Sequence, residues 1–123
     1  MQSVDLKERT ILVTGAAGFI GSNLVLELLN TVEAVKLIGL DSVNDYYDVS
    51  IKEYRLNLIK KLASEKPDSK WTFIKGNLAD KALIEDVFHT YKPDIVVNLA
   101  AQAGVRYSIE NPDAYIEANI IGF

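Results

Sequence analysis

The chain has no cysteine, which excludes disulfide bonds and metal sites built on thiolates. It also has no apolar run of the roughly 18 residues that a membrane-spanning helix needs. Its first nine residues, MQSVDLKER, are too polar for a secretory signal. Thirteen Lys and Arg against 17 Asp and Glu give a net charge of −4, and the sequence has no Lys/Arg cluster. Both observations argue against nucleic acid or an anionic membrane as a partner, because these need concentrated positive charge. We therefore expect a cytoplasmic protein without a nucleic-acid partner, a membrane partner or a bound metal.

Short apolar runs alternate with amphipathic segments along the whole chain. The patterns predict strands at 10–14, 35–40, 71–75 and 94–99, and helices at 19–30, 51–63, 80–91 and from 112 to the end. The second helix would bury one face that carries Ile51, Tyr54, Leu58, Ile59 and Leu62. Alternation of this kind predicts an α/β fold, a doubly wound parallel sheet in the order 3-2-1-4 with helices on both faces. Residues 1–123 would form one domain.

Three glycines at intervals of three follow the first predicted strand, in the stretch TGAAGFIG at 14–21. A strand, a glycine turn and a helix together make an anion site, because the first turn of the helix presents unpaired N–H groups and a partial positive charge. We assign Gly15 to a tight turn, Gly18 to close approach of phosphates and Gly21 to helix packing. A glycine turn without a ligand is the competing interpretation. A P-loop is excluded because no Gly-Lys-Ser/Thr follows.

Asp41 ends the second predicted strand, 20 residues after Gly21. An acidic side chain at this place can accept hydrogen bonds from the ribose of an adenosine. The same carboxylate would repel a 2′-phosphate, which favours NAD over NADP. The loop and the acid together predict an NAD site at the carboxyl ends of the strands, where the strand order reverses.

The Gly-x-x-Gly-x-x-Gly spacing resembles that of the extended short-chain dehydrogenase/reductase family of nucleotide-sugar epimerases and dehydratases. NDYYD at 44–48 and LAAQAGVRYS at 99–108 look like the UDP-glucuronate 4-epimerase branch of that family. Nearly the whole chain takes part in the resemblance. It implies a Rossmann-type fold and a parent enzyme that inverts C4 of a UDP-sugar through a 4-keto intermediate. A dehydratase, a UDP-galactose 4-epimerase or a non-catalytic dinucleotide-binding module are the alternatives.

The resemblance also implies a set of NAD-binding residues at the ends of the four strands. Those for the pyrophosphate are Gly15, Gly18, Phe19, Ile20 and Gly21. Those for the adenosine half are Asp41, Ser42, Asn44, Asp45, Asn77 and Leu78. Those toward the nicotinamide are Leu99, Ala100, Ala101, Gln102 and Asn119. Arg106 would meet a sugar carboxylate or a phosphate of the substrate, or else be a solvated loop arginine. Asn77 stands where the family commonly has a carboxylate.

The proton-transfer pair of this family, Tyr-x-x-x-Lys, does not occur at any of the six tyrosines. The resemblance therefore implies an N-terminal NAD-binding segment without catalytic residues, cut before the later strands and the substrate domain, and inactive by itself. We expect the strand at 94–99 to keep an open apolar edge, which predicts self-association or partial disorder of the last helix.

Overall fold

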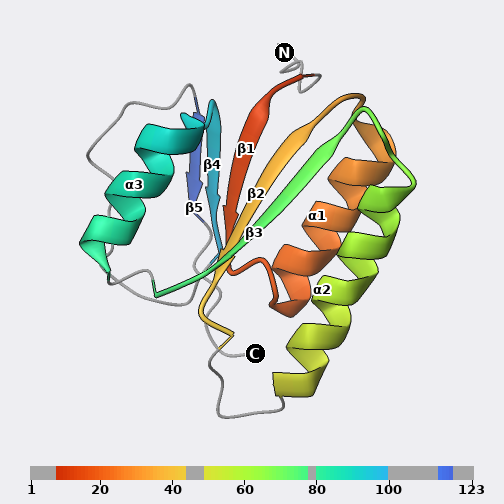
Figure 1. Ribbon diagram of the computed structural model, residues 1–123, viewed down its shortest axis with the longest axis horizontal. Coiled ribbons are helices and arrows are strands. Elements are labelled where there is room, and N and C mark those ends of the chain that lie inside the picture. Colours follow the sequence, from red (N-terminus) through yellow and green to blue (C-terminus); the bar gives the residue numbers. More distant parts are fainter. Residues whose placement is uncertain (1–7, 44–48, 78–79, 100–113, 118–123) are drawn as a thin grey trace.

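The computed structural model describes residues 8–43, 49–77, 80–99 and 114–117 (Figure 1). Three helices and five strands lie in this part of the chain. In order they are β1 (Thr10–Thr14), α1 (Phe19–Thr31), β2 (Lys36–Asp41), α2 (Val49–Ser64), β3 (Lys70–Lys75), α3 (Lys81–Tyr91), β4 (Ile95–Asn98) and β5 (Ala114–Glu117). None of the three helices is long and apolar enough to cross a bilayer.

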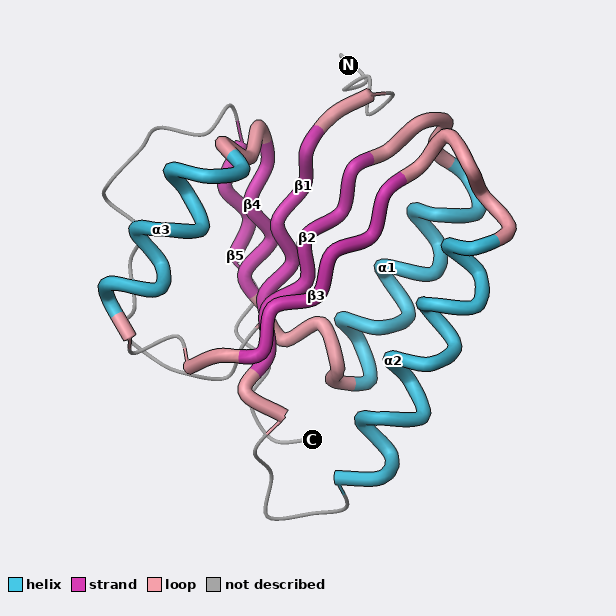
Figure 2. Tube along the Cα trace, viewed as in Figure 1, coloured by secondary structure: helices cyan, strands magenta, loops and turns pink. Residues whose placement is uncertain are grey.

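The strands form one parallel sheet in the order β3-β2-β1-β4-β5, which Figure 2 shows side by side. The predicted order of the first four strands, 3-2-1-4, is confirmed. Thr14 at the end of β1 pairs with Leu40 in β2 and with Asn98 in β4. The chain therefore adds strands on one side of β1 and then crosses to the other side. Parallel pairing places the carboxyl ends of β1, β2 and β4 at one edge of the sheet, and open α/β sheets bind ligands at this edge where the strand order reverses.

Helices cover both faces of the sheet, with α1 and α2 on one face and α3 on the other (Figure 1). Successive strand residues point to opposite faces. Ile11 and Val13 accordingly pack in the cluster with α1 and α2, whereas Leu12 packs with Phe88 of α3. The helix predicted at 80–91 begins at Lys81 with Asp80 as its N-cap, since the Asp80 side chain accepts a hydrogen bond from the Leu83 amide at 3.1 Å. Both layers of the core therefore take apolar side chains from the same central strands.

The helix predicted from residue 112 onward is wrong over Ala114–Glu117, which form β5. This strand pairs with β4 in parallel, from Ile95 with Ala114 to Asn98 with Glu117. Pairing satisfies the outer N–H and C=O groups of β4, and tyrosine and isoleucine in the segment favour a strand. The open β4 edge on which the self-association prediction rested is therefore absent. The rest of the predicted helix lies outside the described residues.

The predicted buried face of α2 is also wrong at three of its five residues. Ile51 is 46%, Tyr54 59% and Leu58 39% exposed, whereas Ile59 is fully buried. The inner face instead begins with Lys52 and Arg55, both mostly covered, and continues into apolar residues. The helix is turned by about one residue relative to the prediction, because its first turns face the polar edge of the sheet.

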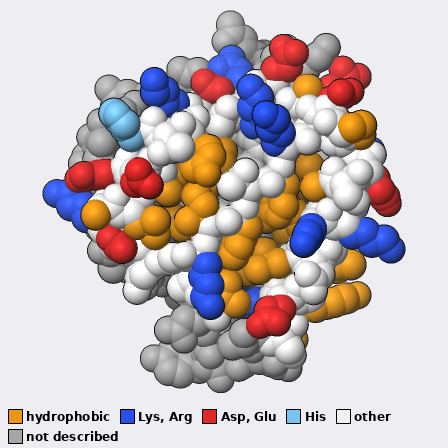
Figure 3. All heavy atoms as spheres, viewed as in Figure 1, with side chains coloured by type: hydrophobic (Ala, Val, Ile, Leu, Met, Phe, Trp, Pro, Cys, Tyr) orange, Lys and Arg blue, Asp and Glu red, His pale blue; other side chains and the backbone are white. Residues whose placement is uncertain are grey.

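The outer strand β3 has four half-buried residues between two exposed lysines. In Figure 3 hydrophobic side chains gather along this edge, between the α3 side and the α2 side of the molecule. Trp71 stacks on Phe73 with ring centroids 6.3 Å apart. It also lies over Gly39 of β2, where an added Cβ would be 2.3 Å from the Trp71 ring and 2.9 Å from the Ala16 Cβ. Because Gly39 has no side chain, the Trp71 indole and Ala16 of the loop after β1 can both pack against its backbone.

We predict that Gly39→Ala destabilises the fold by about 1–3 kcal/mol, because the new methyl group overpacks this place. Urea unfolding would measure the loss, and Lys36→Ala on the exposed start of the same strand should change stability by less than about 0.5 kcal/mol. Trp71→Phe removes the part of the indole that the new methyl group would meet. In that background the destabilisation caused by Gly39→Ala should fall to about half or less. Equal costs in both backgrounds would contradict the contact.

Candidate functional site

The glycine loop, residues 15–18, turns the chain from β1 into α1. Gly15 has φ 71°, a left-handed conformation that glycine adopts without strain. Its N–H donates to the Leu40 carbonyl at 2.8 Å, and the Gly18 N–H donates to the Gly15 carbonyl at 3.0 Å. The tight turn predicted at Gly15 is therefore present, and it is tied to the end of β2.

The start of α1 packs directly on this loop. A Cβ on Gly21 would stand 2.1 Å from the Gly15 carbonyl oxygen, a distance that no side chain can tolerate. A Cβ on Gly18 would stand 3.2 Å from the same oxygen. The two glycines therefore keep the first turn of the helix and the loop in close contact. They also leave a bare backbone surface that the phosphates of a dinucleotide can approach.

The first turn of α1 offers unpaired amide groups. Gly18 is the N-cap, and no side chain in the described part of the chain caps the helix. The first α-helical bond in this turn runs from the Ser22 N–H to the Gly18 carbonyl at 2.9 Å. The amides of Phe19, Ile20 and Gly21 precede that bond, so they are among the orphan donors of a helix start. The Phe19 side chain is 67% exposed, which leaves the turn open to solvent. Such a turn is a ready site for a pyrophosphate.

Asp41 joins the glycine loop to the end of β2. Its Oδ2 accepts a hydrogen bond from the Ala17 N–H at 3.0 Å, and its Oδ1 accepts one from the Val43 N–H at 2.8 Å. The β1–β2 register explains the contact, since Thr14 lies opposite Leu40 and both chains leave the sheet at the same level. The acid and the loop are thus brought together as the sequence predicted.

Two cations of α2 also reach this place, and sequence reasoning missed both. The Lys52 Nζ lies 3.1 Å from the Asp41 Oδ1 in a salt bridge. The Arg55 guanidinium donates to the Ala17 carbonyl at 3.3 Å and lies 5.8 Å from the centre of the Phe19 ring. A signal was available, because positions 52, 55 and 59 share one helical face and the strand before the helix ends in an acid.

The other described candidates follow the neighbouring strands. Leu99 directly follows β4 and is half-buried; its N–H donates to the Thr14 hydroxyl at 3.1 Å. Ser42 is half-buried beside Asp41. Asn77 is exposed and follows Gly76, whose N–H donates to the Asp41 carbonyl at 3.1 Å. The loop, Asp41 and the residues after β3 and β4 therefore lie at one edge of the sheet.

Asn98 has a structural role that the sequence did not indicate. It is 2% exposed at the end of β4, and its Oδ1 accepts a hydrogen bond from the buried Thr14 hydroxyl. This pair joins β1 and β4 where the strand order reverses. Eight predicted site residues lie outside the described residues: Asn44, Asp45, Leu78, Ala100, Ala101, Gln102, Arg106 and Asn119.

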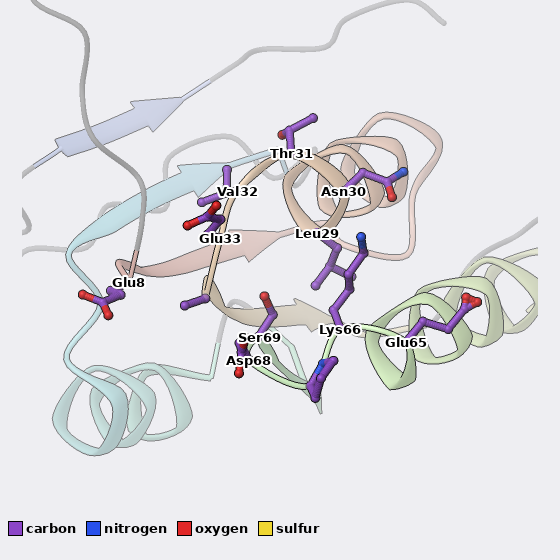
Figure 4. A pocket seen from close by; sticks show the side chains of 12 residues that line it. Glu8, Leu29, Asn30, Thr31, Val32, Glu33, Glu65, Lys66, Asp68 and Ser69 are labelled. Carbon is purple, nitrogen blue, oxygen red and sulfur yellow. The ribbon is translucent and has the colours of Figure 1, made fainter.

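A hollow of about 640 Å³ lies at the other end of the sheet (Figure 4). It is lined by the end of α1, the turn into β2 and the turn from α2 into β3, with several acidic side chains. Ligands of open parallel sheets bind at the carboxyl ends of the strands, and this hollow is at the amino ends. We therefore assign the candidate site to the glycine loop and Asp41.

Nearly the whole chain is similar to known proteins. Residues 12–123 match the sequence model of the GDP-mannose 4,6 dehydratase family. The chain is 52% identical to Protein CapI of Staphylococcus aureus over 92% of its own length and 31% of that protein. It is 41% identical to UDP-glucuronate 4-epimerase 3 of Arabidopsis thaliana over 93% of its own length and 24% of that protein.

Two solved structures are similar to the chain. One is the UDP-glucuronic acid 4-epimerase of Bacillus cereus with UDP-glucuronic acid and NAD, at 30% identity and a TM-score of 0.60, over 85% of this chain and 30% of that one. The other is the dTDP-glucose 4,6-dehydratase of Bacillus anthracis with NAD, at 33% identity and a TM-score of 0.61, over 77% of this chain and 27% of that one.

The chain spans about a quarter to a third of the length of these relatives. The resemblance to nucleotide-sugar epimerases and dehydratases, drawn from the glycine spacing and two further stretches, is confirmed. Since the match covers residues 12–123, the protein belongs to the GDP-mannose 4,6 dehydratase family.

Proposed function

We propose that the chain is the NAD-binding part of a nucleotide-sugar epimerase that inverts C4 of UDP-glucuronate. One observation carries the proposal: the Asp41 carboxylate is hydrogen-bonded to the glycine loop, beside the open first turn of α1. A ribose acceptor and a pyrophosphate site are thus adjacent, which is the arrangement that an adenosine diphosphate requires. Relatives named UDP-glucuronate 4-epimerase support the choice of substrate.

The described residues divide the work of binding. The amides of Phe19, Ile20 and Gly21 would donate to the pyrophosphate, whose charge the helix dipole of α1 favours. Gly15 and Gly18 would leave room for it. Asp41 would accept hydrogen bonds from the adenosine ribose. The donor set and the bare backbone fit a dinucleotide better than a nucleoside triphosphate, since no P-loop lysine follows the loop.

NAD, when bound, supplies a hydride acceptor and donor for C4, so that a 4-keto sugar can be reduced again from its other face. This chain would hold the cofactor and set its orientation toward the substrate. It contains no Tyr-x-x-x-Lys pair, so none of its own side chains fills the proton-transfer role of that pair. We propose that the remaining part of a longer enzyme supplies that pair and the sugar site.

A 4,6-dehydratase is the second candidate. The family model is that of a GDP-mannose 4,6 dehydratase, and one similar structure is a dTDP-glucose 4,6-dehydratase. Both reactions start from oxidation at C4, so the cofactor half of the site does not distinguish them. The product does, because a dehydratase loses water at C5 and C6 whereas an epimerase keeps every atom of the sugar.

We predict that the purified chain binds NAD and that Asp41→Asn weakens binding about 10–100-fold, because a charged acceptor of the ribose is lost. Isothermal titration calorimetry would measure the dissociation constants. Asp68→Asn provides the matched control, since it removes the same charge at the far end of the sheet and should leave binding unchanged. Circular dichroism of both variants would show that they are folded. Equal affinities of Asp41→Asn and the wild type would contradict the assignment.

We also predict that the 123-residue chain does not epimerise UDP-glucuronate in the presence of NAD, because it lacks the proton-transfer pair. Proton NMR of the sugar would follow inversion at C4. The full-length protein encoded by the gene should carry out the reaction under the same conditions. A 4-keto-6-deoxy product from the full-length protein would establish the dehydratase instead, and turnover by the isolated chain would show that the pair is dispensable.

A further inference from the structure

The Asp41 carboxylate is almost enclosed by its partners. Its side chain is 5% exposed. Among the described residues it accepts from three donors, the Ala17 N–H on Oδ2 and both the Val43 N–H and the Lys52 ammonium on Oδ1. A ribose hydroxyl therefore cannot reach both carboxylate oxygens while all three donors stay in place.

The three donors differ in how easily they can move. The amides of Ala17 and Val43 belong to the main chain, and the loop around Ala17 is tied to Leu40 through the Gly15 N–H. Lys52 is the third donor, and it holds the carboxylate through a flexible four-carbon stem. Its side chain is 15% exposed, which puts it on the solvent side of the carboxylate. Lys52 can therefore leave Oδ1 without any change in the backbone.

We propose that Lys52 is a specificity-determining residue of the adenosine ribose subsite, where it yields Asp41 to the ribose and provides the positive charge that a 2′-phosphate needs. The inference rests on the proposed function, because it takes the subsite to be that of NAD. It changes the expectation drawn from Asp41 alone. A carboxylate by itself repels a 2′-phosphate, whereas a carboxylate paired with a lysine has no net charge.

The geometry makes the lysine available to such a phosphate. A ribose hydroxyl bonded to Asp41 would lie within hydrogen-bond distance of the carboxylate, and the Lys52 Nζ lies 3.1 Å from Oδ1 of the same group. An ammonium group has three donors and binds a phosphate as a compact charge. Arg55 lies nearby but is bound to the loop, where it donates to the Ala17 carbonyl and lies over the Phe19 ring.

The test compares NAD with NADP in binding to the whole chain. Calorimetry would give both dissociation constants for the wild type, Lys52→Met and Lys52→Arg. We expect the ratio of the NADP constant to the NAD constant to rise at least tenfold in Lys52→Met, because NADP loses its cation while NAD gains an unoccupied carboxylate. Lys52→Arg should keep the ratio within about threefold of the wild type, since the charge remains.

Lys60→Met is the matched control, because it removes the same charge from an exposed position two turns further along α2. Its ratio should equal that of the wild type. A lysine that merely anchors α2 would weaken both nucleotides equally in Lys52→Met, and an unchanged ratio would overturn the proposal. A wild type that binds neither nucleotide would overturn the proposed function, and the present inference with it. Binding of NAD with an unchanged ratio would overturn the inference alone.

Discussion

The hydrogen bonds of one carboxylate hold the carboxyl edge of this sheet together. Asp41 receives the Ala17 amide from the glycine loop, the Val43 amide from the end of β2 and the Lys52 ammonium from α2. A buried carboxylate without such partners would be strongly disfavoured, so each of these segments is required to stay near it. The loop for which we propose a pyrophosphate therefore has its position fixed by the residue for which we propose the ribose.

The parallel sheet makes this convergence possible. Thr14 pairs with Leu40 on one side and Asn98 on the other, so β1, β2 and β4 end at the same level. The buried hydrogen bond from the Thr14 hydroxyl to Asn98 joins β1 and β4 at the point where the strand order reverses. The Leu99 amide donates a second hydrogen bond to the Thr14 hydroxyl. The buried polar pair Thr14 and Asn98 thus lies where the apolar part of β1 and β4 ends and the candidate site begins. A ligand placed there meets groups from three strands at once.

Sequence patterns sufficed where local chemistry decides the structure. Glycine spacing predicted the turn, apolar runs predicted four strands, and the amphipathic pattern over 80–91 predicted α3. They failed where a distant partner decides. Ala114–Glu117 form a strand because the edge of β4 lies beside them, and the tyrosine and isoleucine of the segment favour a strand only weakly by themselves. The same limit explains α2, whose apolar residues Ile51 and Tyr54 remain exposed while charged ones turn inward.

Lys52 shows why this limit matters for function. In a sequence, a lysine in a helix that also carries glutamate and arginine indicates a solvated face, and only the position of Asp41 gives it another meaning. Once the two are in contact, the acid is no longer a bare negative charge. Selectivity between two cofactors that differ by one phosphate depends on the net charge at the ribose, and a pair has a different net charge from its acid. The charge of Asp41 alone therefore does not describe the electrostatic environment of the ribose, because the charge of Lys52 lies beside it.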